Sequence, residues 1–230
     1  MNESLQTVYA GGTGVALAQR NRVLRNTYWL LALSLVPTVL GAWIGVSTGV
    51  MNAMGVGMSA IIFLAGAFGF IFAIEKTKNS ATGVPILLAF TFFMGLMLAR
   101  LLSVILGFRN GPTLIMTAFG GTAGVFFAMA ALASVIKRDL SGMGKWLFVG
   151  ALAIMIGAII NVFVGSPAGM AVIATLAIMV FSLYLLYDLK RIVDGGETNY
   201  ITATLGLYLS LFNIFQSLLM LLGMFGGDRE

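Results

Sequence analysis

The chain has 230 residues, of which 60% are hydrophobic and 9% charged, with a formal charge of +5 and neither cysteine nor histidine. A soluble core of this size cannot bury so much apolar surface, so the composition predicts an integral membrane protein. The missing cysteine and histidine exclude disulfides, thiolate or imidazole metal ligands and histidine-based catalysis. The basic residues fall in short clusters between apolar runs, which is typical of membrane loops and does not indicate a nucleic-acid interface.

The first 26 residues form a polar segment before the first long apolar run. Arg20, Arg22 and Arg25 stand directly before that run, whereas a cleaved signal peptide has a short apolar core followed by small residues. We therefore expect residues 1–26 to be a retained, cytoplasmic and disordered tail. The run GGTG at residues 11–14 lacks the lysine and the spacing of a phosphate-binding loop, so it predicts a flexible turn.

Seven apolar segments follow, each long enough for a membrane-spanning helix, which needs about 20 residues. They are predicted at residues 27–47, 54–74, 82–106, 113–136, 146–164, 168–187 and 200–225. Unbroken apolar runs suit helices, whereas a β-barrel would show an alternating pattern. The expected fold is all-α: a polytopic membrane protein whose seven-helix bundle forms one domain over residues 27–226, followed by a short tail at 227–230. Glycine pairs at four-residue spacing, Gly41 with Gly45 and Gly120 with Gly124, predict close helix packing.

The basic residues between the segments predict how the helices are oriented. Ten of the 13 lysines and arginines lie before the first segment or next to the links after segments two, four and six. Arg109 and Arg229 lie on the other side. Because basic loops stay in the cytoplasm, the amino terminus is predicted in the cytoplasm and the carboxyl terminus on the outer side of the membrane. Arg100 lies about 27 Å along segment three, so we expect an outer anchor, with a pore residue as the alternative.

Segments six and seven each carry a polar face. On segment seven, small and polar residues recur at spacings of three or four and so share one side of a helix: Thr202, Gly206, Ser210, Asn213 and Ser217. On segment six, Tyr184, Asp188 and Arg191 form a similar stripe. In one interpretation the two faces enclose a hydrated cleft in which Asp188 serves ion passage or pH sensing. In the other, Asp188 lies at the cytoplasmic interface and pairs with Arg191 one turn on.

The link between these segments contains two further acids, Asp194 and Glu197, beside two glycines. Acids in such a loop are expected to be solvated. Catalysis is not expected, because an intramembrane aspartyl protease needs a second aspartate at the depth of Asp188. The nearest candidate, Asp228, lies almost at the chain end.

Four stretches stand out together: NRVLRNTYWLLALSL, GGTAGVFFAMAALASVIKRDLSGMG, FSLYLLYDLKRI and GGETNYITATLGLYLSLFNIFQSLLMLLG. They resemble the Bax-inhibitor (transmembrane Bax inhibitor motif) family, most closely its bacterial YccA-type branch, from about Arg20 onward. The resemblance implies a seven-helix fold with a central seventh helix. In relatives it also implies a pH-sensitive calcium leak controlled by two aspartates, on helices six and seven. Asp188 matches the first aspartate, whereas Ser210 stands where the second would be.

The missing carboxylate weakens the prediction of a calcium site. Calcium takes about 6 to 8 oxygens, usually from several carboxylates, and here Asp188 would be helped only by Ser210, Asn213 and backbone oxygens. We expect weak calcium binding at most, no other cofactor, and weaker pH gating than in relatives with both aspartates. The bacterial branch also implies restraint of the membrane-anchored ATP-dependent protease FtsH in the inner membrane. Because the aspartate pair is broken while GGETNYI is intact, a regulator of FtsH is the expected function, with a cation leak as the alternative.

Overall fold

The structure, a computed structural model, describes residues 3–228, and the regular elements within this range are helices. In chain order they are α1 (Glu3–Thr48), α2 (Val50–Ala53), α3 (Val56–Thr77), α4 (Gly83–Leu106), α5 (Gly111–Val135), η1 (Ser141–Met143), α6 (Gly144–Val164), α7 (Pro167–Val193) and α8 (Tyr200–Gly226). Seven of the described helices are long and apolar enough to cross a membrane. The predicted all-α bundle of seven spanning helices is confirmed.

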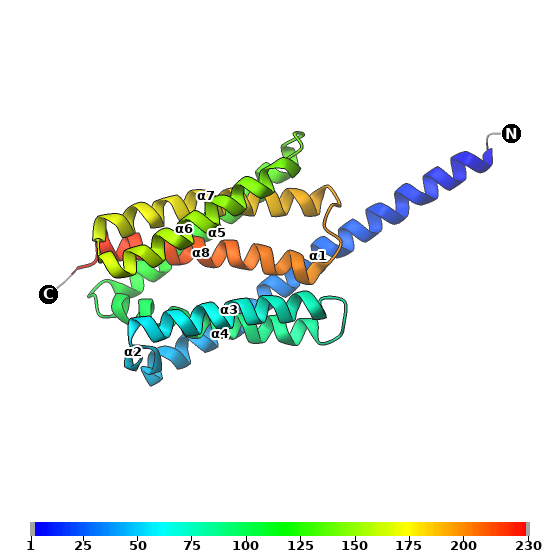
Figure 1. Cartoon of the computed structure of the whole chain (residues 1–230). Helices are drawn as coiled ribbons and strands as arrows, with labels where there is room; N and C mark the ends of the chain where they lie inside the picture. The colour runs from blue at the N-terminus through cyan, green and yellow to red at the C-terminus, as the bar shows by residue number, and fades with distance from the viewer. Residues whose placement is uncertain (1–2, 229–230) are drawn as a thin grey trace.

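Helix α8 lies at the centre of the bundle. It runs between α1, α3 and α4 on one side and α5, α6 and α7 on the other (Figure 1), and it packs against all of these except α6. Every residue of α8 from Tyr200 to Met224 is at least half-buried, whereas α6 packs mainly on α7 and exposes large apolar side chains such as Phe163. Lipid-facing outer helices around a covered central helix are what a bilayer favours. The expected central seventh span is therefore confirmed.

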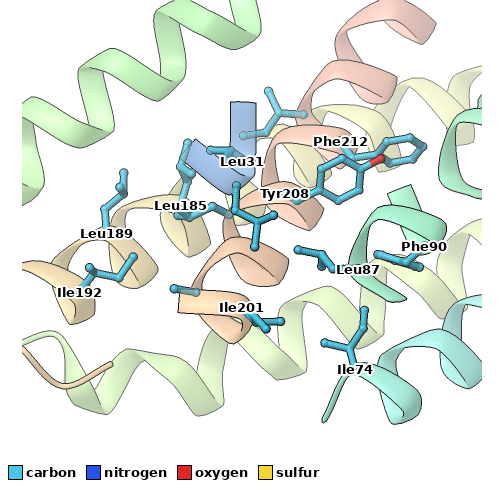
Figure 2. Packing of buried hydrophobic residues seen from close by; sticks show 14 of the residues in the cluster. Leu31, Ile74, Leu87, Phe90, Leu185, Leu189, Ile192, Ile201, Tyr208 and Phe212 are labelled. Carbon is cyan, nitrogen blue, oxygen red and sulfur yellow. The ribbon is translucent and has the colours of Figure 1, made fainter. Parts of the chain in front are cut away.

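Large aliphatic and aromatic side chains fill the space around α8 (Figure 2). The ring of Tyr208 on α8 lies against Phe90 of α4 and Phe212, with centroids 6.1 and 6.0 Å away. Its hydroxyl lies 2.9 Å from Oγ1 of Thr38 on α1, which satisfies the polar end of this buried ring. One side chain thus joins α1, α4 and α8.

Helices α1 and α4 approach each other backbone to backbone. A Cβ built on Gly41 would lie 2.1 Å from the carbonyl oxygen of Phe92, and one built on Gly95 would lie 2.0 Å from that of Thr38. Backbone oxygens cannot move aside as flexible side chains do, so glycine is required at both positions. The predicted close packing at Gly41, and at Gly45 one turn on, is confirmed.

The second glycine pair behaves differently. No heavy atom of a neighbour lies within 4 Å of a Cβ built on Gly120 or Gly124, and both residues are exposed on the outer face of α5. The prediction of close packing is wrong for this pair, because α5 turns another face to α8.

Helix α1 begins much earlier than predicted. It is continuous from Glu3, so residues 11–14, predicted as a flexible turn, are helical, and residues 3–26 are helical where disorder was expected. Extension of an existing helix gains one hydrogen bond per residue, and its single proline, Pro37, lies far downstream. The first part of α1 projects beyond the other helices, and the two chain ends lie at opposite ends of the bundle (Figure 1).

Helix α7 ends later than predicted, at Val193 and not at residue 187. The reason is that Leu189 and Ile192, each 1% exposed, still face the core. Asp188 therefore lies within the helix. Helices α3, α5 and α7 finish at one end of the bundle, which we call the basic end. It carries these residues, the first three within α1 and the others on helix ends and loops: Arg20, Arg22, Arg25, Lys76, Lys78, Lys137, Arg138, Lys145, Lys190 and Arg191.

Candidate functional site

The loop of residues 194–199 turns the chain sharply back at the end of α7. Gly195 has a φ of 78°, a left-handed conformation that favours glycine. Its N–H donates to the carbonyl of Ile192, and the N–H of Gly196 donates to that of Arg191 at 2.9 Å. This is the Schellman arrangement, in which the two residues after a helix satisfy its last carbonyls. The next residue, Glu197, is thereby returned to the side of α7.

Glu197 is tied down at both carboxylate oxygens. Its Oε2 lies 3.2 Å from a guanidinium nitrogen of Arg191, and its side chain is only 11% exposed. Its Oε1 accepts the backbone N–H of Asn199 at 3.0 Å. The prediction of a solvated Glu197 is wrong, and the two preceding glycines were the signal that could have revealed it. Asp194, in contrast, stays 48% exposed while it pairs with Lys190.

Asn199 fixes the start of α8. Its Oδ1 accepts the N–H groups of Ile201 and Thr202, so it caps the helix. Its Nδ2 donates to the carbonyl of Lys78 and to Oδ1 of Asn79, both in the α3–α4 connection. One side chain therefore ties the start of α8 to the α3–α4 connection.

A pocket of about 190 Å³ lies between α7 and α8 beneath this loop. Asp188 faces Gly206 across it, and Arg191, Glu197 and Thr202 line it toward the basic end. Oδ2 of Asp188 lies 2.8 Å from a Cβ built on Gly206, so the carboxylate occupies the space that a side chain there would need. Among the residues that the structure describes, Asp188 has no ion-pair partner within 4 Å, since Arg191 is paired with Glu197.

Comparison with known proteins identifies the family. Residues 20–227 match the family described as "Inhibitor of apoptosis-promoting Bax1". The chain belongs to the Bax inhibitor family. It is 38% identical over 213 residues to the "Modulator of FtsH protease YccA" of Escherichia coli strain K12, covering 93% of this chain and 94% of that protein. The "Inner membrane protein YccA" of Escherichia coli O6:H1 gives the same values. An "Uncharacterized membrane protein" of Vibrio cholerae is 37% identical over 214 residues, 91% of this chain and 92% of its own.

This Bax inhibitor family protein is thus a multi-pass membrane protein, and its fold brings together only part of the predicted polar site. Asp188, Arg191, Thr202 and Gly206 line one pocket. The other predicted residues do not line it: Tyr184, Ser210, Asn213 and Ser217.

Gly206 and not Ser210 faces Asp188. Four helical residues advance about 6 Å along the axis, so Ser210 lies one turn farther from the basic end, where it is 3% exposed. Asn213 donates its side-chain N–H to Leu209 of its own helix at 2.8 Å. The polar face of α8 is real, but only its first turns border the pocket.

The oxygen donors in the pocket do not make a resident calcium site. Within residues 3–228 no group of three acidic, histidine or cysteine side chains could hold a metal ion. Glu197 is already neutralised by Arg191, which leaves Asp188 and the hydroxyl of Thr202 against the roughly 6 to 8 oxygens that calcium prefers. The pocket suits water or a passing cation better than a tightly held one.

Arg100 lies far from this pocket in the Bax inhibitor bundle. It sits in the last two turns of α4, at the end opposite the basic end, and its guanidinium lies 3.4 Å from the carbonyl oxygen of Met54 in the α2–α3 link. The contact joins α4 to that link.

Proposed function

We propose that this Bax inhibitor family protein modulates a membrane-anchored ATP-dependent protease of the FtsH type in the bacterial inner membrane. The observation that carries the proposal is its 38% identity, over 93% of the chain, to a protein named as a modulator of FtsH protease. The helical projection of α1 beyond the bundle supports it (Figure 1). Under the positive-inside rule the basic end is cytoplasmic, so α1 would offer a graspable terminus to a protease that works there.

Deletion of residues 2–17 tests the proposal, because it shortens this projection but keeps Arg20 and the spanning segment. We expect the shortened protein to lose its effect on the half-life of a membrane substrate of the protease, measured after synthesis is stopped. The matched control is Asp188→Asn in the full-length chain, which should modulate the protease as the parent does. If the shortened protein protects the substrate as well as the full-length chain, the proposal is contradicted.

A second candidate function is slow passage of cations between α7 and α8. It is favoured by the carboxylate of Asp188, which faces a pocket and has no ion-pair partner among the described residues. In reconstituted vesicles we expect Asp188→Asn to abolish calcium flux, while Glu75→Gln, which removes an acid from the exposed Lys78 pair, leaves it unchanged. Equal flux through parent and Asp188→Asn, or no flux through either, rejects this candidate.

A further inference from the structure

We infer that the Arg191–Glu197 ion pair is a gate between the Asp188 pocket and a second hollow at the basic end. This gate controls access of water and small solutes to Asp188. It stands apart from the protease proposal, because it requires neither the projecting part of α1 nor a partner protein.

Two hollows meet at Glu197. The second one has a volume of about 260 Å³ and lies between α1, which contributes Arg20 and Val23, and the α7–α8 loop, which contributes Asp194, Glu197 and Thr198. Glu197 also lines the Asp188 pocket on its other side. The Glu197 side chain is therefore part of the wall that the two hollows share, and its displacement would join them.

The ion pair holds this wall in place without locking it. Glu197 is 11% exposed, but the Arg191 side chain is 46% exposed, so water competes for the guanidinium. Ion pairs of this partly exposed kind are weak and break without unfolding of the protein. The backbone of the loop stays fixed meanwhile, because the hydrogen bonds from Gly195 and Gly196 to α7 do not involve the carboxylate.

Arg20 supplies a partner for the open state. It lines the hollow that Glu197 borders, and its Nε is buried without a hydrogen-bond partner among the described residues. No described carboxylate lies within 4 Å of its guanidinium nitrogens. A buried donor without a partner is costly. Rotation of Glu197 from Arg191 to Arg20 exchanges one ion pair for another, gives up the hydrogen bond from the Asn199 N–H to Oε1, and opens the wall.

The absence of cysteine makes the gate measurable. A single thiol at Leu209→Cys lies in the Asp188 pocket beyond the gate, and its reaction rate with a water-soluble cationic methanethiosulfonate reports access. We expect Glu197→Gln to raise this rate about two- to fivefold, the range that a weak ion pair accounts for. Arg20→Gln should lower it, and Glu75→Gln, which alters the exposed Lys78 pair, should leave it unchanged.

A double variant with exchanged charges distinguishes loss of the ion pair from misfolding. The double variant Arg191→Glu, Glu197→Arg restores an ion pair in the opposite sense. It should bring the Leu209→Cys rate to that of the parent or below it, because an arginine at position 197 cannot pair with Arg20 in the open state. A thiol placed at the fully buried Ile214 reports unfolding of the Glu197→Gln protein. If the thiol at position 214 reacts, the double variant with the exchanged charges is decisive. Slow labelling of its Leu209→Cys thiol supports the gate, and fast labelling overturns it. An unchanged rate in a folded Glu197→Gln protein also overturns it.

Discussion

At the scale of single residues, Asp188 and Gly206 depend on each other. The carboxylate reaches the point where a Cβ at position 206 would lie, 2.8 Å from Oδ2. A methyl group there would push the carboxylate into another rotamer or separate α7 from α8. Both consequences would change the shape of the pocket, so the pocket depends on Gly206 as much as on Asp188.

Gly206→Ala should destabilise the protein by about 1 to 3 kcal/mol, as overpacking does in a tight interior. The same substitution in an Asp188→Ala background should cost much less, because the clashing oxygens are gone. Unfolding in detergent, followed by circular dichroism, measures both values. Gly120→Ala is the control, since nothing lies near its built Cβ, and a cost that persists without Asp188 would contradict this account.

Asp139, in the loop before η1, gives an expected pH effect. The N–H and the hydroxyl of Ser141 donate to its carboxylate at 2.8 and 2.9 Å, which holds the pKa of Asp139 below its usual 3.8. A lowered folded-state pKa contributes stability that is present above the unfolded pKa and is lost as pH falls through the folded one. The Asp139→Asn variant should therefore lose less thermal stability than the parent as the pH falls below about 4. The melting temperature measured against pH checks this, and parallel curves for variant and parent would refute the prediction.

At the scale of elements, the α7–α8 loop connects three parts of the bundle. Its backbone caps α7, Glu197 pairs with Arg191, and Asn199 both caps α8 and bonds the α3–α4 connection. The loop is short, but it is where α7, α8 and the α3–α4 pair are held in register.

Two substitutions separate the roles of Asn199. Asn199→Asp keeps the oxygen that accepts from Ile201 and Thr202 but loses the donor to Lys78 and Asn79, whereas Asn199→Ala loses both. We expect the alanine variant to lose about 1 to 2 kcal/mol of unfolding free energy from the missing cap, and in addition the contribution of the hydrogen bonds to Lys78 and Asn79. The aspartate variant should lose only the contribution of those hydrogen bonds. Denaturant unfolding distinguishes them, and equal losses would show that the cap contributes nothing.

The helices were predictable and their ends were not. Apolar length alone located all seven spans, because a bilayer requires long apolar helices. The end of α7 was missed because polar residues continue a helix when one of its faces is still packed, as Leu189 and Ile192 show. The start of α1 was missed because an existing helix extends through polar residues without such packing.

For the candidate site, the sequence predicted which face of each helix is polar but not the relative position of the two helices along their axes. Helical spacing predicted polar faces on the last two spans, and of their residues Asp188, Arg191, Thr202 and Gly206 line the pocket. It could not show how far α8 is shifted along α7, so Ser210 was expected where Gly206 lies. The return of Glu197 depended on the positive φ of Gly195, a property of the folded loop.

At the scale of the whole molecule, the charge distribution predicts the orientation in the membrane. The basic end should be cytoplasmic. Single cysteines at the exposed positions Ser47 and Gly142, at opposite ends of the bundle, test this. In intact spheroplasts an impermeant thiol reagent should label Ser47→Cys at once and Gly142→Cys only after permeabilisation, and the reverse pattern would show an inverted protein.

The central position of α8 also constrains how the protein is made. Synthesis runs from the amino end, so α8, around which the bundle packs, is made after the six other spans. Until then the inward residues of the earlier six spans, such as Leu87 and Leu185, lack the α8 side chains that cover them in the folded bundle. A chain that stops after Val193 would therefore lack the contacts around which the rest of the bundle is packed.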